Sequence, residues 1–339
     1  MRKEIAWVVI IGIVLGLVMA FGVYRINSSA GKNSASPEPS SSPKPGNPEL
    51  SITLDKPEDN DVVTLSSVTV SGITKSLAWI AVSGEKDDYI IQASDSGIFS
   101  QDVNLIPGIN QIKLTAFDSA GQENASKVLV VYSSSFVTAT IPTPNPLEST
   151  TGSSEIRLKV AQKVEAALNR PKAFIGTVTD IADSTIQIKT EDSQIEQIST
   201  GGDGITITKA TGTTGKAVKL TDIAIGDFIV AMGYVNGNSV LNAQRILITD
   251  PITEPKINST ISNVTATSKK NITVTGLKDN QATTITPDKN TTIESYSSGK
   301  TATLKLGSIK SGDTVIYVTD SSGTTPVIRA IFVVTKSQG

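Results

Sequence analysis

Hydrophobic residues recur along this chain with three different spacings, and each spacing predicts a different kind of element. From Ile5 to Tyr24 the chain is uncharged and almost wholly apolar, and a helix needs about 20 such residues to cross a bilayer. In residues 49–134 and 171–336, short runs alternate apolar and polar positions, which is typical of half-buried β-strands. Between 153 and 170, apolar residues recur every four positions and predict one amphipathic helix. We therefore expect a mainly β protein.

The N-terminal apolar segment predicts a transmembrane signal anchor in residues 1–26. Arg2 and Lys3 precede it, and this slight positive bias favours a cytoplasmic N-terminus with the bulk of the chain outside the cell. Because the apolar run is longer than an ordinary signal core, we expect it to stay attached. The small residues at Val18-Met19-Ala20 leave an alternative, which is secretion after cleavage near Ala20.

Stretches rich in turn-forming residues divide the rest of the chain. Residues 27–48 are rich in Pro and Ser, and residues 135–152 in Pro and Thr, and neither composition can bury a core. Their prolines favour extended polyproline II, so the first stretch is expected to be a stalk. The helix at 153–170 needs an apolar neighbour, either the β-unit that follows or another chain. A short linker at 251–256 divides the last β-rich block in two.

The first folded block, residues 49–134, predicts a sandwich of two β-sheets, because turn residues and glycines separate about seven short alternating runs. The predicted strands are Ser51–Leu54, Val68–Ser71, Trp79–Ser83, Tyr89–Ala93, Ile98–Leu105, Ile109–Phe117 and Lys127–Tyr132.

Five short motifs in this block resemble the bacterial Ig-like domains of secreted and surface proteins. They are Pro57–Val63, Val68–Gly72, Asp95–Phe99, Pro107–Ile112 and Ala116–Gly121. The resemblance implies an extracellular spacer or adhesion module, and it brings no catalytic residues with it. Asn60 stands where the family usually has glycine.

The second block contains an internal repeat, with units at 171–250 and 257–336. The turn Gly226-Asp227 recurs as Gly312-Asp313, 86 residues later. Glycine there supplies a backbone angle open to few other residues, and aspartate can accept hydrogen bonds from neighbouring amides. Each unit offers about five or six short strands, a number that closes into a small barrel or curls into a strongly bent sheet. We expect two small OB-like barrels.

The two units resemble a bacterial family of small β-barrel repeats of unknown function, found in secreted and membrane-tethered proteins. The first unit fits the family pattern well. In the second, Ser259 stands where the first has Gly176, and no alanine precedes Arg329.

Composition excludes several kinds of chemistry. The chain has no Cys and no His, so it has no disulfide, no thiolate or imidazole metal site, and no nucleophile paired with histidine. A net charge of -2 gives no electrostatic footprint for nucleic acid. The acidic group Asp55, Glu58, Asp59 and Asp61 lacks the spacing of a calcium loop, so we interpret it as a solvated turn.

Carboxylate pairs are the remaining candidates for catalysis. Asp87-Asp88 and Glu191-Asp192 lie in polar, turn-like runs where nothing is expected to desolvate them, so their pKa values should not be tuned for catalysis. We therefore expect no enzyme, no catalytic residue, no cofactor and no metal. A hydrolase that uses carboxylates alone stays open as a third hypothesis.

Trp79 is the candidate interaction residue. Ile80 and Val82 should point into the sandwich, which leaves Trp79 on the outer face, either as a recognition anchor or against the next domain.

The sequence favours a non-enzymatic, membrane-tethered extracellular protein with a structural, display or adhesion role. The alternative is a carbohydrate- or peptidoglycan-binding accessory module. Expected partners are the lipid bilayer through Ile5–Tyr24 and a cell-wall polymer or another surface protein, and no nucleic acid.

Overall fold

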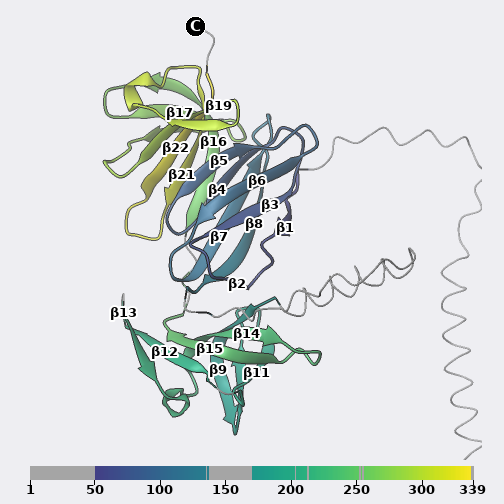
Figure 1. The fold of residues 1–339 in the computed structure, drawn as a ribbon. Helices are drawn as coiled ribbons and strands as arrows, with labels where there is room; N and C mark the ends of the chain where they lie inside the picture. Colours follow the sequence, from purple (N-terminus) through teal and green to yellow (C-terminus); the bar gives the residue numbers. More distant parts are fainter. Residues whose placement is uncertain are drawn as a thin grey trace, which may run out of the picture. The chain divides into compact units, whose positions relative to one another are not determined.

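The computed structural model describes residues 50–134, 136, 170–202, 204–211, 214–251, 253 and 256–336 (Figure 1). All of the described residues belong to one compact unit. The predicted signal anchor at 1–26 and the linker at 27–48 lie outside the described residues. So do nearly all of the linker at 135–152 and all of the helix predicted at 153–170 except Arg170. Within the described ranges, no helix has the length and apolar character needed to span a bilayer.

The described residues form β-strands joined by turns, with two short 3-10 helices as the only helical elements among them. The prediction of a mainly β protein is therefore confirmed.

The Ig-like module (residues 49–134) is a two-sheet sandwich, as predicted. One sheet contains β1 (Thr53–Lys56), β3 (Ser67–Ile73) and β6 (Ile98–Asn104). The other continues through β2 (Asp61–Val63), β8 (Glu123–Tyr132), β7 (Gly108–Phe117), β4 (Trp79–Ser83) and β5 (Asp88–Gln92). Apolar residues from both sheets share one buried core. The short strand β2 was not predicted.

Repeat 1 (residues 171–250) closes a ring of strands. Its elements are β9 (Lys172–Ala182), β10 (Thr185–Lys189), β11 (Ile195–Ser199), β12 (Thr206–Thr211), β13 (Thr214–Val218), the 3-10 helix η1 (Leu220–Asp222), β14 (Phe228–Val235) and β15 (Leu241–Thr249). Successive pairing runs from β9 through β10, β11, β15 and β14 back to β9. The β12–β13 hairpin extends from β15.

Repeat 2 (residues 257–336) has the matching elements in an open sheet. They are β16 (Ile257–Thr267), β17 (Ile272–Gly276), β18 (Ala282–Ile285), β19 (Thr292–Ser297), β20 (Lys300–Thr303), η2 (Leu306–Ser308), β21 (Thr314–Asp320) and β22 (Val327–Thr335). The strand order is β18-β17-β16-β21-β22-β19-β20.

The expectation of two closed barrels is therefore wrong for repeat 2. In repeat 1 the ring closes where β11 pairs with the start of β15, at the fully buried Leu241. The corresponding start of β22 is Val327, which is 46% exposed and follows Pro326. Proline has no N–H to donate to a ladder, and β18 pairs with β17 alone among the described strands.

The repeated turn behaves as the sequence predicts. Gly226 and Gly312 both have positive φ, at 95° and 92°, and their N–H groups donate to the carbonyl oxygens of Val178 and Val264. The carboxylate of Asp227 accepts the N–H of Ala224 at 2.8 Å. In repeat 2, Asp313 accepts the N–H of Lys310 at 2.9 Å. Each turn thus fixes the entry into the strand that follows.

Both repeats pack on the Ig-like module through the same face. In repeat 1, Ile175, Val230 and Met232 share a buried cluster with Val62 and Val131 of the Ig-like module. The equivalent residues of repeat 2, 86 positions later in the chain, are Ile261, Ile316 and Val318. They also share a buried cluster with the Ig-like module. Strands β14 and β21 are therefore apolar on both faces, because one faces the repeat's own core and the other faces a second module.

Candidate functional site

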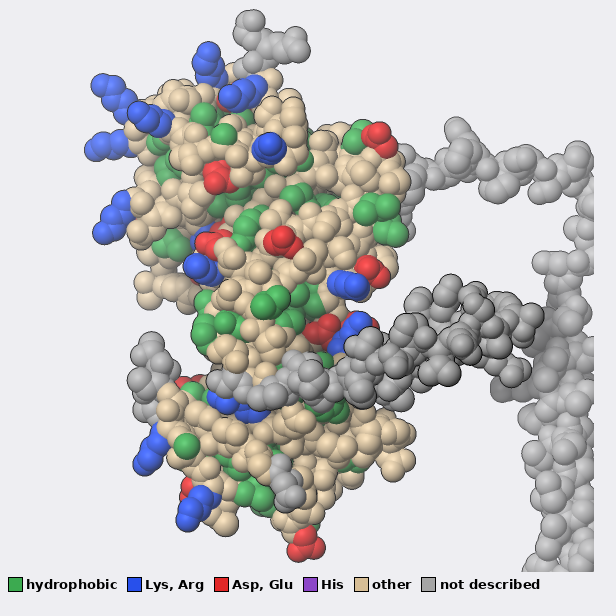
Figure 2. All heavy atoms as spheres, viewed as in Figure 1, with side chains coloured by type: hydrophobic (Ala, Val, Ile, Leu, Met, Phe, Trp, Pro, Cys, Tyr) green, Lys and Arg blue, Asp and Glu red, His purple; other side chains and the backbone are tan. Residues whose placement is uncertain are grey.

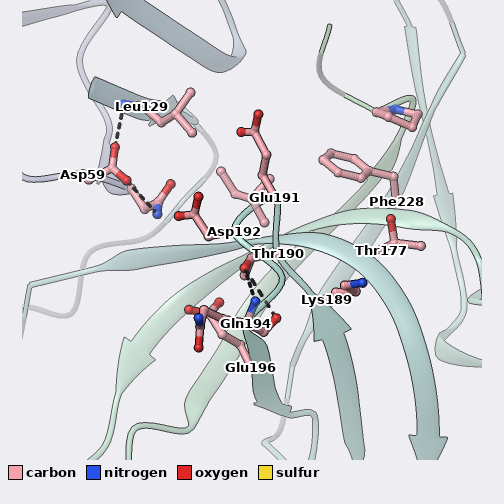
Figure 3. Close-up of a pocket in the computed structure, with 13 residues that line it drawn as sticks. Asp59, Leu129, Thr177, Lys189, Thr190, Glu191, Asp192, Gln194, Glu196 and Phe228 are labelled. Carbon is pink, nitrogen blue, oxygen red and sulfur yellow. Dashed lines mark hydrogen bonds between the residues drawn. The ribbon is translucent and has the colours of Figure 1, made fainter. Parts of the chain in front are cut away.

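A cleft of about 310 Å³ lies where the Ig-like module meets repeat 1 (Figure 3). Its apolar wall includes Leu129, Ile175, Phe228 and Pro251. Four carboxylates also line it, from Asp59, Glu191, Asp192 and Glu196. Against these, Lys189 is the only cationic residue among the described residues that line the cleft, so these residues carry a net negative charge near neutral pH.

Local hydrogen bonds hold the acidic rim of the cleft in place. The hydroxyl of Thr190 accepts the N–H of Gln194 at 3.1 Å and closes the turn between β10 and β11. Glu191 and Asp192 project from this turn (Figure 3). On the other side, a carboxylate oxygen of Asp59 accepts the N–H of Leu129 at 2.8 Å. Two separate modules therefore supply the carboxylates.

Burial changes the chemistry of one of these groups. Desolvation raises the pKa of Glu196 above its usual range, because a partly buried carboxylate loses water that stabilises its charge. Among the lining residues that the structure describes, Phe228 is the only aromatic one, so they do not supply the set of aromatic rings expected of a sugar-stacking platform. Its polar character favours a ligand that donates hydrogen bonds.

A second cleft, of about 630 Å³, lies between the β4–β5 hairpin and repeat 2. In it Asp88 pairs with Arg329 at 2.9 Å, with side chains 6% and 17% exposed. Arg329 also donates to the carbonyl oxygen of Gly84 at 2.8 Å. Burial raises the pKa of Asp88, and the charge of Arg329 offsets only part of this effect. The expectation that nothing desolvates the Asp87-Asp88 pair is therefore wrong for Asp88.

The acidic turn near residue 58 is also more than a solvated loop. Lys172 of repeat 1 pairs with Glu58 and with Asp61, each at 2.8 Å, and Arg170 also pairs with Glu58. The hydrogen bond from Lys172 is the main reason that the pKa of Glu58 is lowered. These carboxylates hold repeat 1 against the Ig-like module. Among the described residues, no three acidic side chains are grouped so as to hold a metal ion.

Trp79 lies on the outer face of its sheet, as the alternation predicts, while Ile80 and Val82 are fully buried inside the sandwich. It is half-buried, and its ring meets that of Tyr296 edge-on, with centroids 5.0 Å apart. Trp79 therefore contacts another module of this chain, the second of the two roles considered for it. A role in binding an outside partner stays a prediction.

The carbohydrate-binding alternative predicts several aromatic rings that converge on one face, for example Trp79 with Tyr89 or Phe99, and these rings do not converge. Tyr89 and Phe99 pack into the core of the sandwich, whereas Trp79 packs into the cluster shared with repeat 2. The three rings therefore lie on opposite sides of one sheet and form no common binding face.

Sequence reasoning missed Lys172 and Arg329 as the charges that join the modules. A signal was present for Arg329, which stands inside the otherwise apolar run Val327–Val334. A charge in such a run needs a partner when it is buried. The partner, Asp88, lies 241 residues away along the chain, and local spacing gives no information about it.

Comparison with known proteins finds a family match for part of the chain. Residues 48–133 match the family model of glucodextranase, domain B, in agreement with the Ig-like sandwich seen there. No curated protein matches the chain.

Two of the solved structures that match this chain come from bacterial adhesins. One is the Ca²⁺-stabilized adhesin with which an Antarctic bacterium binds ice, at 12% identity and a TM-score of 0.18 over 86% of this chain and 75% of that one. The other is from a 1.5-MDa bacterial ice-binding adhesin, at 12% identity and a TM-score of 0.18 over 84% of this chain and 96% of that one. At such TM-scores neither bears on the arrangement or role of this chain.

Proposed function

We propose that this chain is a non-enzymatic, membrane-tethered extracellular protein whose β-modules have a structural, display or adhesion role at the cell surface. The observation that carries the proposal is the way the modules share buried cores. Ile175 and Val230 of repeat 1, and Ile261 and Ile316 of repeat 2, pack against the Ig-like module. Such packing yields a firm unit that presents loops and sheet faces. The small OB-like barrel identity of repeat 1, whose strands close a ring, is part of this proposal.

The carboxylates of the two clefts also support a non-enzymatic role, because many of them already stabilise structure. Asp59 accepts a backbone N–H, Asp88 pairs with Arg329, and Asp288 accepts the N–H groups of Asn290 and Thr291 within its own turn. A catalytic acid and base pair needs groups that are free to exchange protons.

The membrane tether is supported by the apolar segment Ile5–Tyr24. The test is to fractionate cells that express the chain, treat intact cells with protease, and sequence the mature N-terminus. We expect membrane association, digestion from outside, and an N-terminus upstream of Ile5. Recovery of the intact chain in the cytosol would contradict the proposal, and an N-terminus near Phe21 would replace the anchor by secretion.

A carbohydrate- or peptidoglycan-binding accessory module is the second candidate, and the match of residues 48–133 to a glucodextranase domain favours it. It predicts binding on a glycan and peptidoglycan array that is weakened by Trp79→Ala at an outer face, or by Glu196→Gln in the cleft. An array with no signal for the wild-type chain would remove this candidate.

A further inference from the structure

Repeat 2 differs from the rest of the described chain in its charge. Residues 257–336 contain nine Lys and Arg against five Asp and Glu. Residues 171–250 contain six against nine, and residues 49–134 contain five against twelve. The net charge of -2 for the whole chain therefore conceals one basic module next to two acidic ones.

The topology collects much of this positive charge at one end of the repeat 2 sheet. Strand β19 runs parallel to β22, with Ser295 opposite Val333, so the β19–β20 turn lies at the end where β22 finishes. The N–H of Gly312 donates to the carbonyl oxygen of Val264, which places the turn before β21 beside the end of β16. Lysines gather at this end: Lys269 and Lys270 lie on the β16–β17 turn, Lys300 begins β20, Lys310 precedes β21 and Lys336 follows β22. We call this group the lysine end.

These five ammonium groups are available to a partner. All five residues are exposed, and none of them takes part in an ion pair with another described residue. Asp313 is the acidic residue nearest to these turns in sequence, and it is 3% exposed and engaged in its own turn. Figure 2 shows Lys and Arg side chains gathered over the part of the surface that belongs to repeat 2.

Repeat 1 shows that the fold itself does not require this charge. Its β9–β10 turn carries Asp183 and Ser184, the turn after η1 carries Ala224, and Asp250 follows β15. The same connections thus hold acidic or neutral residues in one repeat and lysines in the other.

We propose that the lysine end of repeat 2 is a binding surface for a flexible, phosphate-bearing linear polymer. Lysine is a compact, strongly hydrated point charge on a flexible stem, and it suits charges repeated along a mobile chain. The lysine end has no arginine for bidentate contacts. The described turns that carry its lysines also contain no aromatic ring on which bases could stack. Both features favour a simple polyanion over a nucleic acid. The assignment rests on the proposed extracellular function, since a surface protein meets such polymers in the cell envelope.

The experiment measures binding of poly(glycerol phosphate) to the purified full-length chain in uncharged detergent at several salt concentrations. One variant changes all five lysines of the lysine end to glutamine. A control changes five other exposed lysines, Lys209, Lys216, Lys219, Lys256 and Lys289, so that both variants lose the same charge. Anionic vesicles and single-stranded DNA are tested in parallel.

For the wild type we expect log K to fall with log salt with a slope of about −3.5, since five phosphate contacts release counterions. The lysine-end variant should bind at least tenfold more weakly with a flatter slope, and the control variant should bind within about twofold of the wild type. Equal losses in both variants, no binding by the wild type, or tighter binding of vesicles or DNA than of the polymer would each overturn the proposal. Cell fractionation tests the location separately, so failure of one can be told from failure of the other.

Discussion

Arg329 shows how one residue can be redirected by a local irregularity. The β21–β22 pairing passes from Val318 opposite Ala330 to Thr319 opposite Ile328, so Arg329 is left without a cross-strand partner at a bulge. Bulges re-aim side chains, and here the guanidinium reaches Asp88 of the Ig-like module. The pair is buried, so each charge depends on the other.

We expect Arg329→Met to lower the free energy of unfolding by about 3 kcal/mol at neutral pH, because Asp88 would stay buried without its counter-ion. Denaturant titration measures the change. Arg245→Met is the matched control, because Arg245 keeps its cross-strand partner, Met232, beside the bulge between β14 and β15, and it should change stability much less. Adding Asp88→Leu to Arg329→Met should restore most of the loss, and a double variant as unstable as the single one would contradict this account.

The same pair gives a pH dependence with a defined sign. Burial raises the pKa of Asp88, so the folded state takes up its proton more readily than the unfolded chain does. The unfolding free energy of Arg329→Met should therefore recover relative to the wild type as pH falls from about 7 towards about 4. Unfolding midpoints measured across this range test the prediction, and a gap that stays constant would show that Asp88 is not the buried charge responsible.

Glu58 should behave in the opposite way. Its pKa is lowered, mainly by the hydrogen bond from Lys172, so its stabilising effect is present above its unfolded pKa and is lost as pH falls through the folded value. The side chain is 56% exposed, so Glu58→Gln should cost no more than about 0.5 kcal/mol at neutral pH and nothing in acid. A cost that persists at acid pH would mean that packing, and not charge, is lost.

Among the elements, the glycine of the repeated turn allows a test of backbone strain without a change in packing. Gly226 has φ of 95°, and nothing lies within 4 Å of an added Cβ there. Gly226→Ala should therefore destabilise the chain by about 1 kcal/mol through conformation alone. Gly237 also has open space around it but no positive φ, so Gly237→Ala should be neutral or slightly stabilising. Equal thermal shifts for the two variants would argue against strain.

Much of the architecture follows from patterns that the sequence carries locally. Alternation predicts the sandwich strands, and the Gly-Asp turn predicts the repeat, because both depend on neighbouring residues. Alternation does not show whether the second apolar face of β14 or β21 meets water or another module. It also does not show that β18 fails to close a ring, which depends on backbone pairing at Val327. The clefts and the pair of Asp88 with Arg329 arise between modules, so no local pattern predicts them.

At the scale of the whole molecule, Trp79 can report whether repeat 2 is docked. The chain has two tryptophans, Trp7 and Trp79, so in a Trp7→Phe background the emission comes from Trp79 alone. Tyr296→Ala removes the ring that meets Trp79 edge-on, and we expect a red shift with easier quenching by acrylamide. Tyr89→Ala, on the opposite face of the same sheet, should leave the emission nearly unchanged. Identical spectra for all three chains would mean that Trp79 is not covered by repeat 2.

The shared clusters predict that the modules hold together without a covalent link. A protease site placed in the 251–256 linker allows repeat 2 to be cut from the rest of the folded chain. Because Ile261, Ile316 and Phe332 are buried against the Ig-like module, the two pieces should elute together in size-exclusion chromatography. Phe332→Asp would bury a charge in that contact and should release repeat 2 after cleavage. The control is Ile225→Asp, since Ile225 is 66% exposed and its change should not separate the pieces. If the cut wild type instead separates into two peaks, one of the size of repeat 2, then only the linker joins the modules and the shared core does not form in solution.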